Sequence, residues 1–198
     1  MPPGRPLAVA VTGGIGAGKS AALAAFARHG AATVSSDEIV HRLLREDEGV
    51  RQALLDRFGE RILDEAGHVD RKAIAEIVFE DREALAWLEA LLHPLVVREY
   101  LDWRRGLARL PNPPALCVTE VPLLYEVGGE SRFDAVVVVT APEPLRARRA
   151  AMPIEARSRR LIPDEEKVRR ADFAYVNDGS LADLDAFVSG VVDKLTRR

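Results

Sequence analysis

The sequence predicts an α/β protein built on a doubly wound parallel sheet, and three observations support that prediction. Continuous apolar runs of strand length recur along the chain, as expected for strands that are covered on both faces. Helical patterns separate these runs near both ends of the chain. Between the second and third runs lies a purely helical stretch of roughly seventy residues, which predicts a helical insertion into the core.

The beginning of the chain predicts a strand–helix–strand unit. Residues 7–11 are apolar and partly β-branched, and a glycine-rich segment follows them. Residues 20–28 are rich in alanine and predict a helix, with Gly30 in the place that glycine often takes after a helix. Residues 31–35 predict the second strand.

Residues 38–114 form the predicted insertion, in which apolar residues recur on helical faces. Pro94 interrupts this pattern, and we expect it to open a new helix at its first turn. A proline-rich segment ends the insertion. The predicted core comprises residues 1–37 and 115–198. Its further elements are strands over 115–121, 134–140 and 173–176 and a helix over 181–195.

The composition excludes several classes of protein. The chain has 198 residues, enough for one domain with a small subdomain, and a formal net charge of −3, which predicts no nucleic-acid partner. No apolar run approaches the length of a membrane span, and the start of the chain lacks the apolar segment of a secretory signal. We therefore expect a cytoplasmic protein. The single cysteine, Cys117, lies in an apolar run and predicts a buried thiol rather than a disulfide.

Residues 13–20 match the phosphate-binding pattern G-x-x-x-x-G-K-[ST] in full, after a predicted strand and before a predicted helix. The glycines let backbone N–H groups wrap a phosphate, and the helix N-terminus adds partial positive charge. We expect Lys19 to contact the β- and γ-phosphates and the Ser20 hydroxyl to bind Mg²⁺. The pattern thus predicts a P-loop that binds a nucleoside triphosphate. The residues assigned to nucleotide binding are Gly13, Gly14, Gly16, Ala17, Gly18, Lys19, Ser20 and Ala21.

Two carboxylates follow strands whose carboxyl ends are expected at one edge of the sheet. Asp37 could accept the proton of an attacking hydroxyl or hold Mg²⁺ through water. Alternatively, Ser35 and Glu38 form a capping box, and Asp37 only favours the first helical turn. Glu120 ends the third strand, in the place of the acid that helps to hold Mg²⁺ in P-loop proteins, or it is a solvated charge at a strand end.

An arginine-rich segment follows the fourth strand and forms the predicted lid, residues 143–165. Arginine binds phosphate in a bidentate manner and keeps its charge, so this segment predicts a lid that supplies positive charge to a transition state. A solvated basic helix is the alternative. We expect one or two of Arg146, Arg149 and Arg157 to act in catalysis.

Along nearly its whole length, the chain resembles the dephospho-CoA kinase family. Besides the P-loop, the resemblance rests on residues 37–40, 69–71, 77–79, 92–95, 120–126, 163, 165–167, 171–173 and 177–179. It implies transfer of the γ-phosphoryl group of ATP to the ribose 3′-hydroxyl of dephospho-CoA, by a P-loop core with a helical CoA-binding insertion and a short lid. By position, it implies that Lys19 and Ser20 serve phosphate and Mg²⁺, and that Asp37 lies near the acceptor hydroxyl. Arg146 or Arg149 matches a lid arginine of the family.

Several positions depart from the family pattern. Ser35 and Glu120 stand where the family has aspartate, Ala21 replaces a threonine, and Leu161 replaces a glutamine. The lid is also several residues shorter. Because a shorter lid excludes water less well, we expect slower transfer or some ATP hydrolysis.

Two alternative functions stay open at this point. One is another P-loop kinase with a nucleoside or small-molecule acceptor, and the other is a nucleotide- or CoA-binding protein with weak or no catalysis. The retention of Asp37 together with an intact Lys19 favours a kinase. His93 matches a histidine of the family, but we assign it no role in the chemistry. We expect a small-molecule substrate as the partner, no contact with nucleic acid or membrane, and a monomer or weak homo-oligomer.

Overall fold

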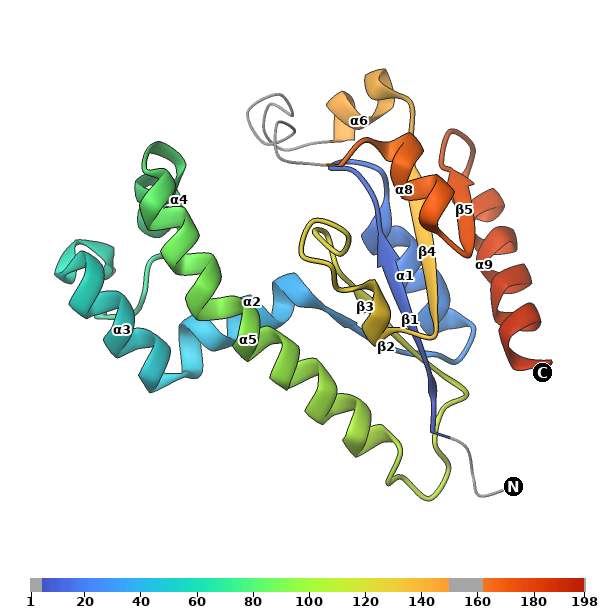
Figure 1. Ribbon diagram of the computed structural model, residues 1–198, viewed down its shortest axis with the longest axis horizontal. Helices are drawn as coiled ribbons and strands as arrows, with labels where there is room; N and C mark the ends of the chain where they lie inside the picture. Colours follow the sequence, from blue (N-terminus) through green and yellow to red (C-terminus); the bar gives the residue numbers. More distant parts are fainter. Residues whose placement is uncertain (1–4, 150–161, 198) are drawn as a thin grey trace. The chain divides into compact units, whose positions relative to one another are not determined.

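The computed structural model describes residues 5–149 and 162–197, and its core is a sheet of five parallel strands (Figure 1). The strands are β1 Leu7–Thr12, β2 Ala32–Ser35, β3 Leu116–Glu120, β4 Ala135–Thr140 and β5 Phe173–Val176. Their order is β2-β3-β1-β4-β5, with β1 in the centre. This order and the parallel pairing confirm the predicted doubly wound sheet. The strands are continuous apolar runs because a sheet of this kind is covered on both faces.

The register of the strands brings the predicted polar residues to one edge of the sheet. Val11 of β1 and Ser35 of β2 both pair with Glu120 of β3, while Thr12 pairs with Val138 of β4. The carboxyl ends of β1, β2 and β3 therefore meet at the edge from which the P-loop leaves β1.

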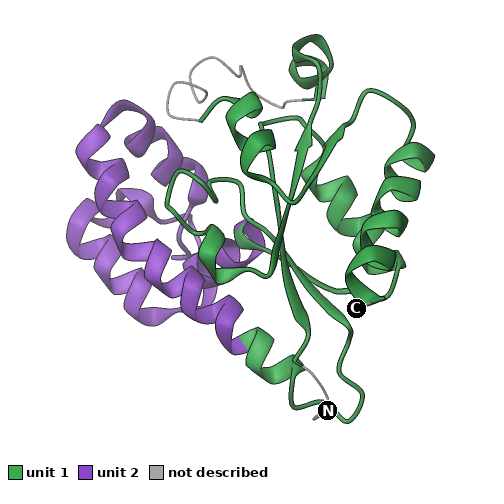
Figure 2. Ribbon diagram, turned by 45° about the vertical axis from the view of Figure 1, so that its right-hand side comes forward, with its two compact units in different colours: residues 1–36, 103–198 green, residues 37–102 purple. Residues whose placement is uncertain are grey.

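The chain divides into two compact units, residues 1–36 with 103–198 and residues 37–102 (Figure 2). The helices of the first unit are α1 Lys19–Arg28, α6 Glu143–Arg149, α8 Asp164–Arg170 and α9 Leu181–Thr196, with a short turn η2 Glu130–Arg132. Those of the rest of the chain are α2 Ser36–Glu46, α3 Glu48–Phe58, η1 Glu60–Ile62, α4 Arg71–Glu80 and α5 Arg82–Leu107.

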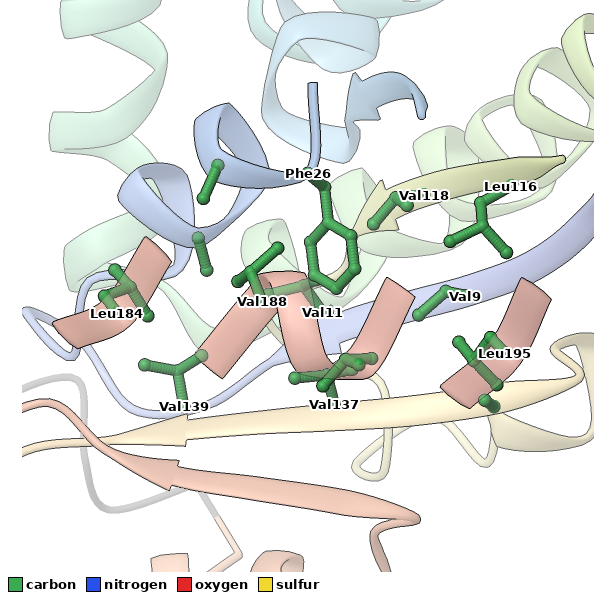
Figure 3. Packing of buried hydrophobic residues seen from close by; sticks show 14 of the residues in the cluster. Val9, Val11, Phe26, Leu116, Val118, Val137, Val139, Leu184, Val188 and Leu195 are labelled. Atoms are coloured by element: carbon green, nitrogen blue, oxygen red, sulfur yellow. The ribbon is translucent and has the colours of Figure 1, made fainter. Parts of the chain in front are cut away.

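Both faces of the sheet are covered by hydrophobic packing. On one face, α1 and α9 enclose the side chain of Phe26, which Figure 3 shows among Val11, Val118 and Val188. Alternate strand residues such as Val138 face the other side, where the segment after β3 covers them. Cys117 is buried as expected, and this burial raises the pKa of its thiol. No helix in the described residues is long and apolar enough to cross a bilayer.

The second unit has a hydrophobic core of its own, which α2, α3, α4 and α5 form together. Within it, the rings of Phe58 and Trp87 pack edge to face, with 5.4 Å between the ring centroids. Asp47 and Asp70 cap α3 and α4 by accepting hydrogen bonds from Val50 and Lys72. This arrangement places most of the predicted helical insertion in a separate compact body, although its role in binding CoA stays a prediction.

The predicted break at Pro94 is wrong, because α5 runs through it as one helix. Proline lacks the N–H that would donate to Ala90 and costs about 3 kcal/mol inside a helix. Leu92 and Val96, on either side of the proline, are both buried. Burial on both sides of the proline offsets its local cost.

The second compact unit ends earlier in the chain than the predicted insertion, which extends to residue 114. The second unit ends at Asp102, and the last turn of α5 belongs to the first unit. There Arg104 donates a hydrogen bond to the carbonyl of Arg132 at 2.8 Å. The proline-rich segment that ends the predicted insertion thus lies beyond α5, in the first unit.

Candidate active site

The P-loop links β1 to α1 and is held in a conformation that requires glycine. At Gly13, where φ is +142°, a Cβ atom would lie 1.9 Å from the carbonyl oxygen of Val139. Gly18, where φ is +101°, precedes α1, and a Cβ there would lie 2.2 Å from Nδ2 of Asn177. The loop therefore packs directly against β4 and the segment after β5.

Asn177, which follows β5, holds the P-loop in place through its side chain. Its side chain, in a residue only 5% exposed, donates a hydrogen bond to the carbonyl of Ala17 at 2.8 Å. Its backbone carbonyl accepts a hydrogen bond from Arg149 at 3.1 Å. No role was predicted for Asn177, although two signals pointed to it: residues 177–179 belong to the family resemblance, and Asn177 directly follows β5 at the carboxyl edge of the sheet.

Lys19 and Ser20, in the first turn of α1, point to two different parts of the site. The ammonium group of Lys19 donates a hydrogen bond to the carbonyl of Gly14 at 3.0 Å, which holds it across the P-loop. The hydroxyl of Ser20 lies 3.1 Å from Oε2 of Glu120, a residue only 5% exposed. Glu120 is therefore a buried, hydrogen-bonded group and not the solvated charge of the alternative interpretation.

The oxygen atoms of Ser20 and Glu120 fit a magnesium ion. Mg²⁺ prefers hard oxygen ligands and usually keeps several waters, so one carboxylate, one hydroxyl and substrate oxygens suffice. The described residues contain no group of three or more histidine, cysteine, aspartate or glutamate side chains that could hold a metal. The oxygen donors that the structure brings together here are therefore those of Ser20 and Glu120.

Asp37 lies in the first turn of α2, two residues after the end of β2. Its side chain is exposed, as is that of the neighbouring Glu38. Ser35, the last residue of β2, immediately precedes the helix. The position of Asp37 is compatible with both functions predicted for it, a carboxylate near an acceptor and a favourable charge at a helix N-terminus.

Two arginines of α6 contact the P-loop or the residue that fixes it. Arg146 pairs with Asp164 of α8 at 2.6 Å, and a Cβ at Gly14 would lie 3.0 Å from its guanidinium carbon. Arg149 is exposed and reaches the carbonyl of Asn177. Asp164 was not among the predicted site residues, because no local pattern connects it with an arginine eighteen residues earlier. Arg157 and Leu161 lie outside the described residues.

Two cavities lie along the P-loop, both within the first unit. The larger, of about 740 Å³, includes Gly14, Arg146 and Asp164 in its lining. The smaller, of about 220 Å³, is lined by Gly16, Gly18, Lys19, Ser20, Ala21 and Arg149. Gly13 and Ala17, also assigned to nucleotide binding, are buried residues of the loop itself. The residues that line these cavities can bind a polyphosphate through backbone N–H groups and three cationic side chains.

Comparison with known proteins gives consistent matches over most of the chain. The family model of dephospho-CoA kinase matches residues 7–183. A dephospho-CoA kinase of Aquifex aeolicus is 34% identical and the alignment covers 96% of this chain and 97% of that protein. A dephospho-CoA kinase of Frankia casuarinae is 38% identical, and the alignment covers 96% of this chain and 84% of that protein.

Solved structures show the same similarity. A Thermus thermophilus protein of known crystal structure has a TM-score of 0.79 and 36% identity, with 98% of this chain and 100% of that chain covered. Dephospho-CoA kinase from Campylobacter jejuni has a TM-score of 0.71 and 28% identity, and the match covers 96% of this chain and 97% of that chain. Shikimate kinase from Aquifex aeolicus, at 12% identity and a TM-score of 0.52 over 95% of this chain and 97% of that one, shares the fold.

Proposed function

We infer the roles of the site residues from one premise: the chain belongs to the dephospho-CoA kinase family and phosphorylates dephospho-CoA with ATP to give coenzyme A. The acceptor is the ribose 3′-hydroxyl, since CoA differs from dephospho-CoA by a phosphate at that position. The observation that supports this assignment most directly is the complete P-loop, with the hydroxyl of Ser20 against Glu120, in a chain that matches the family over residues 7–183.

Lys19 and the loop backbone bind the phosphates of ATP. The positive charge of Lys19 offsets negative charge on the β- and γ-phosphates, and the N-terminus of α1 contributes further partial positive charge. Ser20 and Glu120 hold Mg²⁺, which neutralises charge on the phosphate oxygens when it is bound. The burial of Glu120 and its hydrogen bond with Ser20 support this assignment, because they fix both oxygen donors before substrate arrives.

Asp37 acts on the acceptor. A carboxylate next to the 3′-hydroxyl orients it for in-line attack and accepts its proton as the oxygen attacks the γ-phosphorus atom. The bond between that phosphorus and the β,γ-bridging oxygen of ATP breaks in the same step, and ADP leaves with the bridging oxygen. The position of Asp37, two residues after the end of β2, supports this role, because β2 ends at the same edge of the sheet as β1 and β3.

Arg146 and Arg149 supply positive charge to the transferred phosphoryl group. Arginine is suited to this task because its planar fork donates two hydrogen bonds to phosphate oxygens. Both side chains border the cavities along the P-loop, which supports the assignment.

The remaining parts of the chain have supporting roles in this proposal. The insertion, residues 38–114, binds the CoA moiety of the substrate, and residues 143–165 form the lid. The protein acts in the cytoplasm as a monomer or weak homo-oligomer, with no nucleic-acid or membrane partner. A net charge of −3 supports the exclusion of nucleic acid.

The assignment of the P-loop is tested with Lys19→Ala. We expect this variant to lose roughly 100-fold or more in kcat/KM, since it removes a charge that stabilises the transition state. Lys194→Ala, which changes an exposed lysine on α9, is the matched control and should keep normal activity. Circular dichroism checks that both variants are folded. Normal turnover in folded Lys19→Ala would exclude the proposed role of the P-loop.

A further inference from the structure

Within the described residues, the guanidinium group of Arg146 is held by a hydrogen bond at one end. Its Nη1 atom lies 2.6 Å from Oδ2 of Asp164, and the two side chains are only 16% and 21% exposed. A charge-assisted hydrogen bond of this kind, partly shielded from water, holds a long side chain in one orientation. Nε of Arg146 is also buried, yet no hydrogen-bond acceptor lies within reach of it in the described residues.

The free Nε atom belongs to a cation that lies against the P-loop. A Cβ built on Gly14 would approach both the guanidinium carbon and Nη1 of Arg146 to 3.0 Å. The carbonyl of the same glycine accepts the hydrogen bond of Lys19. Two cationic side chains thus converge on one peptide of the loop. A buried donor without an acceptor is unfavourable, and a phosphate oxygen would supply the missing acceptor.

Asp164 acts from a helix that is itself firmly anchored. It is the first residue of α8, which has only seven residues and depends on tertiary contacts to be stable. Lys167, one turn further along, is completely buried, and its ammonium group lies 2.7 Å from Oε1 of Glu126. The same carboxylate oxygen accepts the N–H of Ile162 at 3.0 Å. Glu126 therefore holds the chain on both sides of Asp164.

We propose that Asp164 is the positioning residue for Arg146. It holds one arm of the guanidinium group against the P-loop and leaves Nε and the rest of the fork to bind an oxygen of the γ-phosphoryl group during its transfer. The Lys167–Glu126 pair fixes the helix that carries Asp164. This inference rests on the proposed function, because it requires that Arg146 acts on the phosphates. It concerns a residue that does not itself touch the reacting atoms.

The test compares Asp164→Asn with Glu166→Gln. Both changes remove one negative charge from α8, but Glu166 lies outside the proposed lid, and its carboxylate lies 3.7 Å from Arg170 and not against Arg146. In Asp164→Asn we expect kcat to fall between about 10- and 100-fold, because a misplaced cation stabilises the transition state poorly. KM for ATP should change by less than about threefold, because a contact made in the transition state affects kcat. Glu166→Gln should keep both values.

A double-mutant cycle separates positioning from a structural role. In the Arg146→Ala background, Asp164→Asn should cause no further loss of kcat, because the residue that it positions is already absent. An equal loss in both backgrounds would overturn the inference. A rise in ATP affinity at unchanged kcat would also overturn it, since Asp164 would then compete with phosphate for the arginine. If Asp164→Asn fails to fold, Asp164→Glu, which keeps the charge on a longer arm, is compared in the same two backgrounds.

The same measurements distinguish this inference from the proposed function. If folded Arg146→Ala keeps the wild-type kcat, then the proposed role of the arginine fails, and the inference fails with it. If Arg146→Ala loses activity and Asp164→Asn does not, then only the positioning role of Asp164 is wrong.

Discussion

The hydroxyl of Ser20 donates a hydrogen bond across 3.1 Å to a carboxylate oxygen of Glu120, so that the P-loop serine and the end of β3 meet at one point. The two residues are one hundred positions apart in the sequence. Parallel pairing brings them together, because Glu120 lies opposite Val11, just before the loop leaves β1. Two hard oxygen donors at the edge of a phosphate-binding loop are ligands of the kind that Mg²⁺ prefers, and this pair is the basis of the proposed magnesium site.

Replacement of Glu120 by glutamine should impair the use of Mg²⁺. The variant keeps the size and the hydrogen-bond acceptor of the side chain and loses its charge. We expect the Mg²⁺ concentration for half-maximal velocity to rise by about 10- to 100-fold. A titration of activity with Mg²⁺ at saturating ATP measures this, and Ser20→Ala should shift the curve in the same direction. An unchanged curve in both variants would contradict the metal assignment.

Asp37→Asn should lower kcat far more than it affects the binding of ATP. Loss of a general base costs about 100- to 10,000-fold in rate. Glu38→Gln is the control, because Glu38 is also an exposed acid in the first turn of α2. Steady-state kinetics and thermal unfolding are measured on both variants. If both lose a similar, small amount of stability and neither loses kcat, the contribution of Asp37 is only to the helix N-terminus.

The ion pair of Lys167 and Glu126 predicts a dependence of stability on both partners. Lys167→Met leaves the buried Glu126 without its cation, and such a change costs about 3–5 kcal/mol. Adding Glu126→Gln removes the uncompensated charge and keeps an oxygen that can accept the N–H of Ile162. We therefore expect the double variant to recover most of the loss in the free energy of unfolding, measured with denaturant. A double variant no more stable than Lys167→Met would show that the pair is not the cause.

Asp134 should make stability depend on pH in acid. Burial raises the pKa of this carboxyl, but hydrogen bonds from Arg5 and from the N–H of Ala8 outweigh it and lower the pKa overall. Its contribution is therefore present above the unfolded pKa, about 3.9, and is lost as pH falls through the lower folded pKa. Asp134→Asn should reduce the free energy of unfolding at neutral pH and flatten its decline in acid. A decline as steep as in the wild type would contradict this.

The sequence was sufficient for the sheet and the P-loop because their signals are local. Apolar strand runs and the spacing of the glycines with Lys19 depend on neighbouring residues, and the structure has the predicted strands at these places. Pro94 shows the opposite case: the rule that predicted a break is also local, but burial on both sides of the proline keeps α5 continuous.

The contacts around the P-loop could not be predicted in the same way. Asn177 reaches Ala17 across 160 positions, and Asp164 pairs with Arg146 from another helix. Such pairs depend on how the helices pack, which no pattern within one segment records. Glu120 is an intermediate case, because its place at a strand end was predicted, whereas its burial required the structure.

The most direct test of the account is the identification of the product. The purified protein is incubated with ATP, Mg²⁺ and dephospho-CoA, and the product is analysed by mass spectrometry and phosphorus NMR. The account predicts a gain of one phosphoryl group, located on the ribose 3′-oxygen, and no gain with Lys19→Ala. Unmodified dephospho-CoA after incubation with folded, ATP-binding wild-type protein, or a phosphate on any other oxygen, would contradict it.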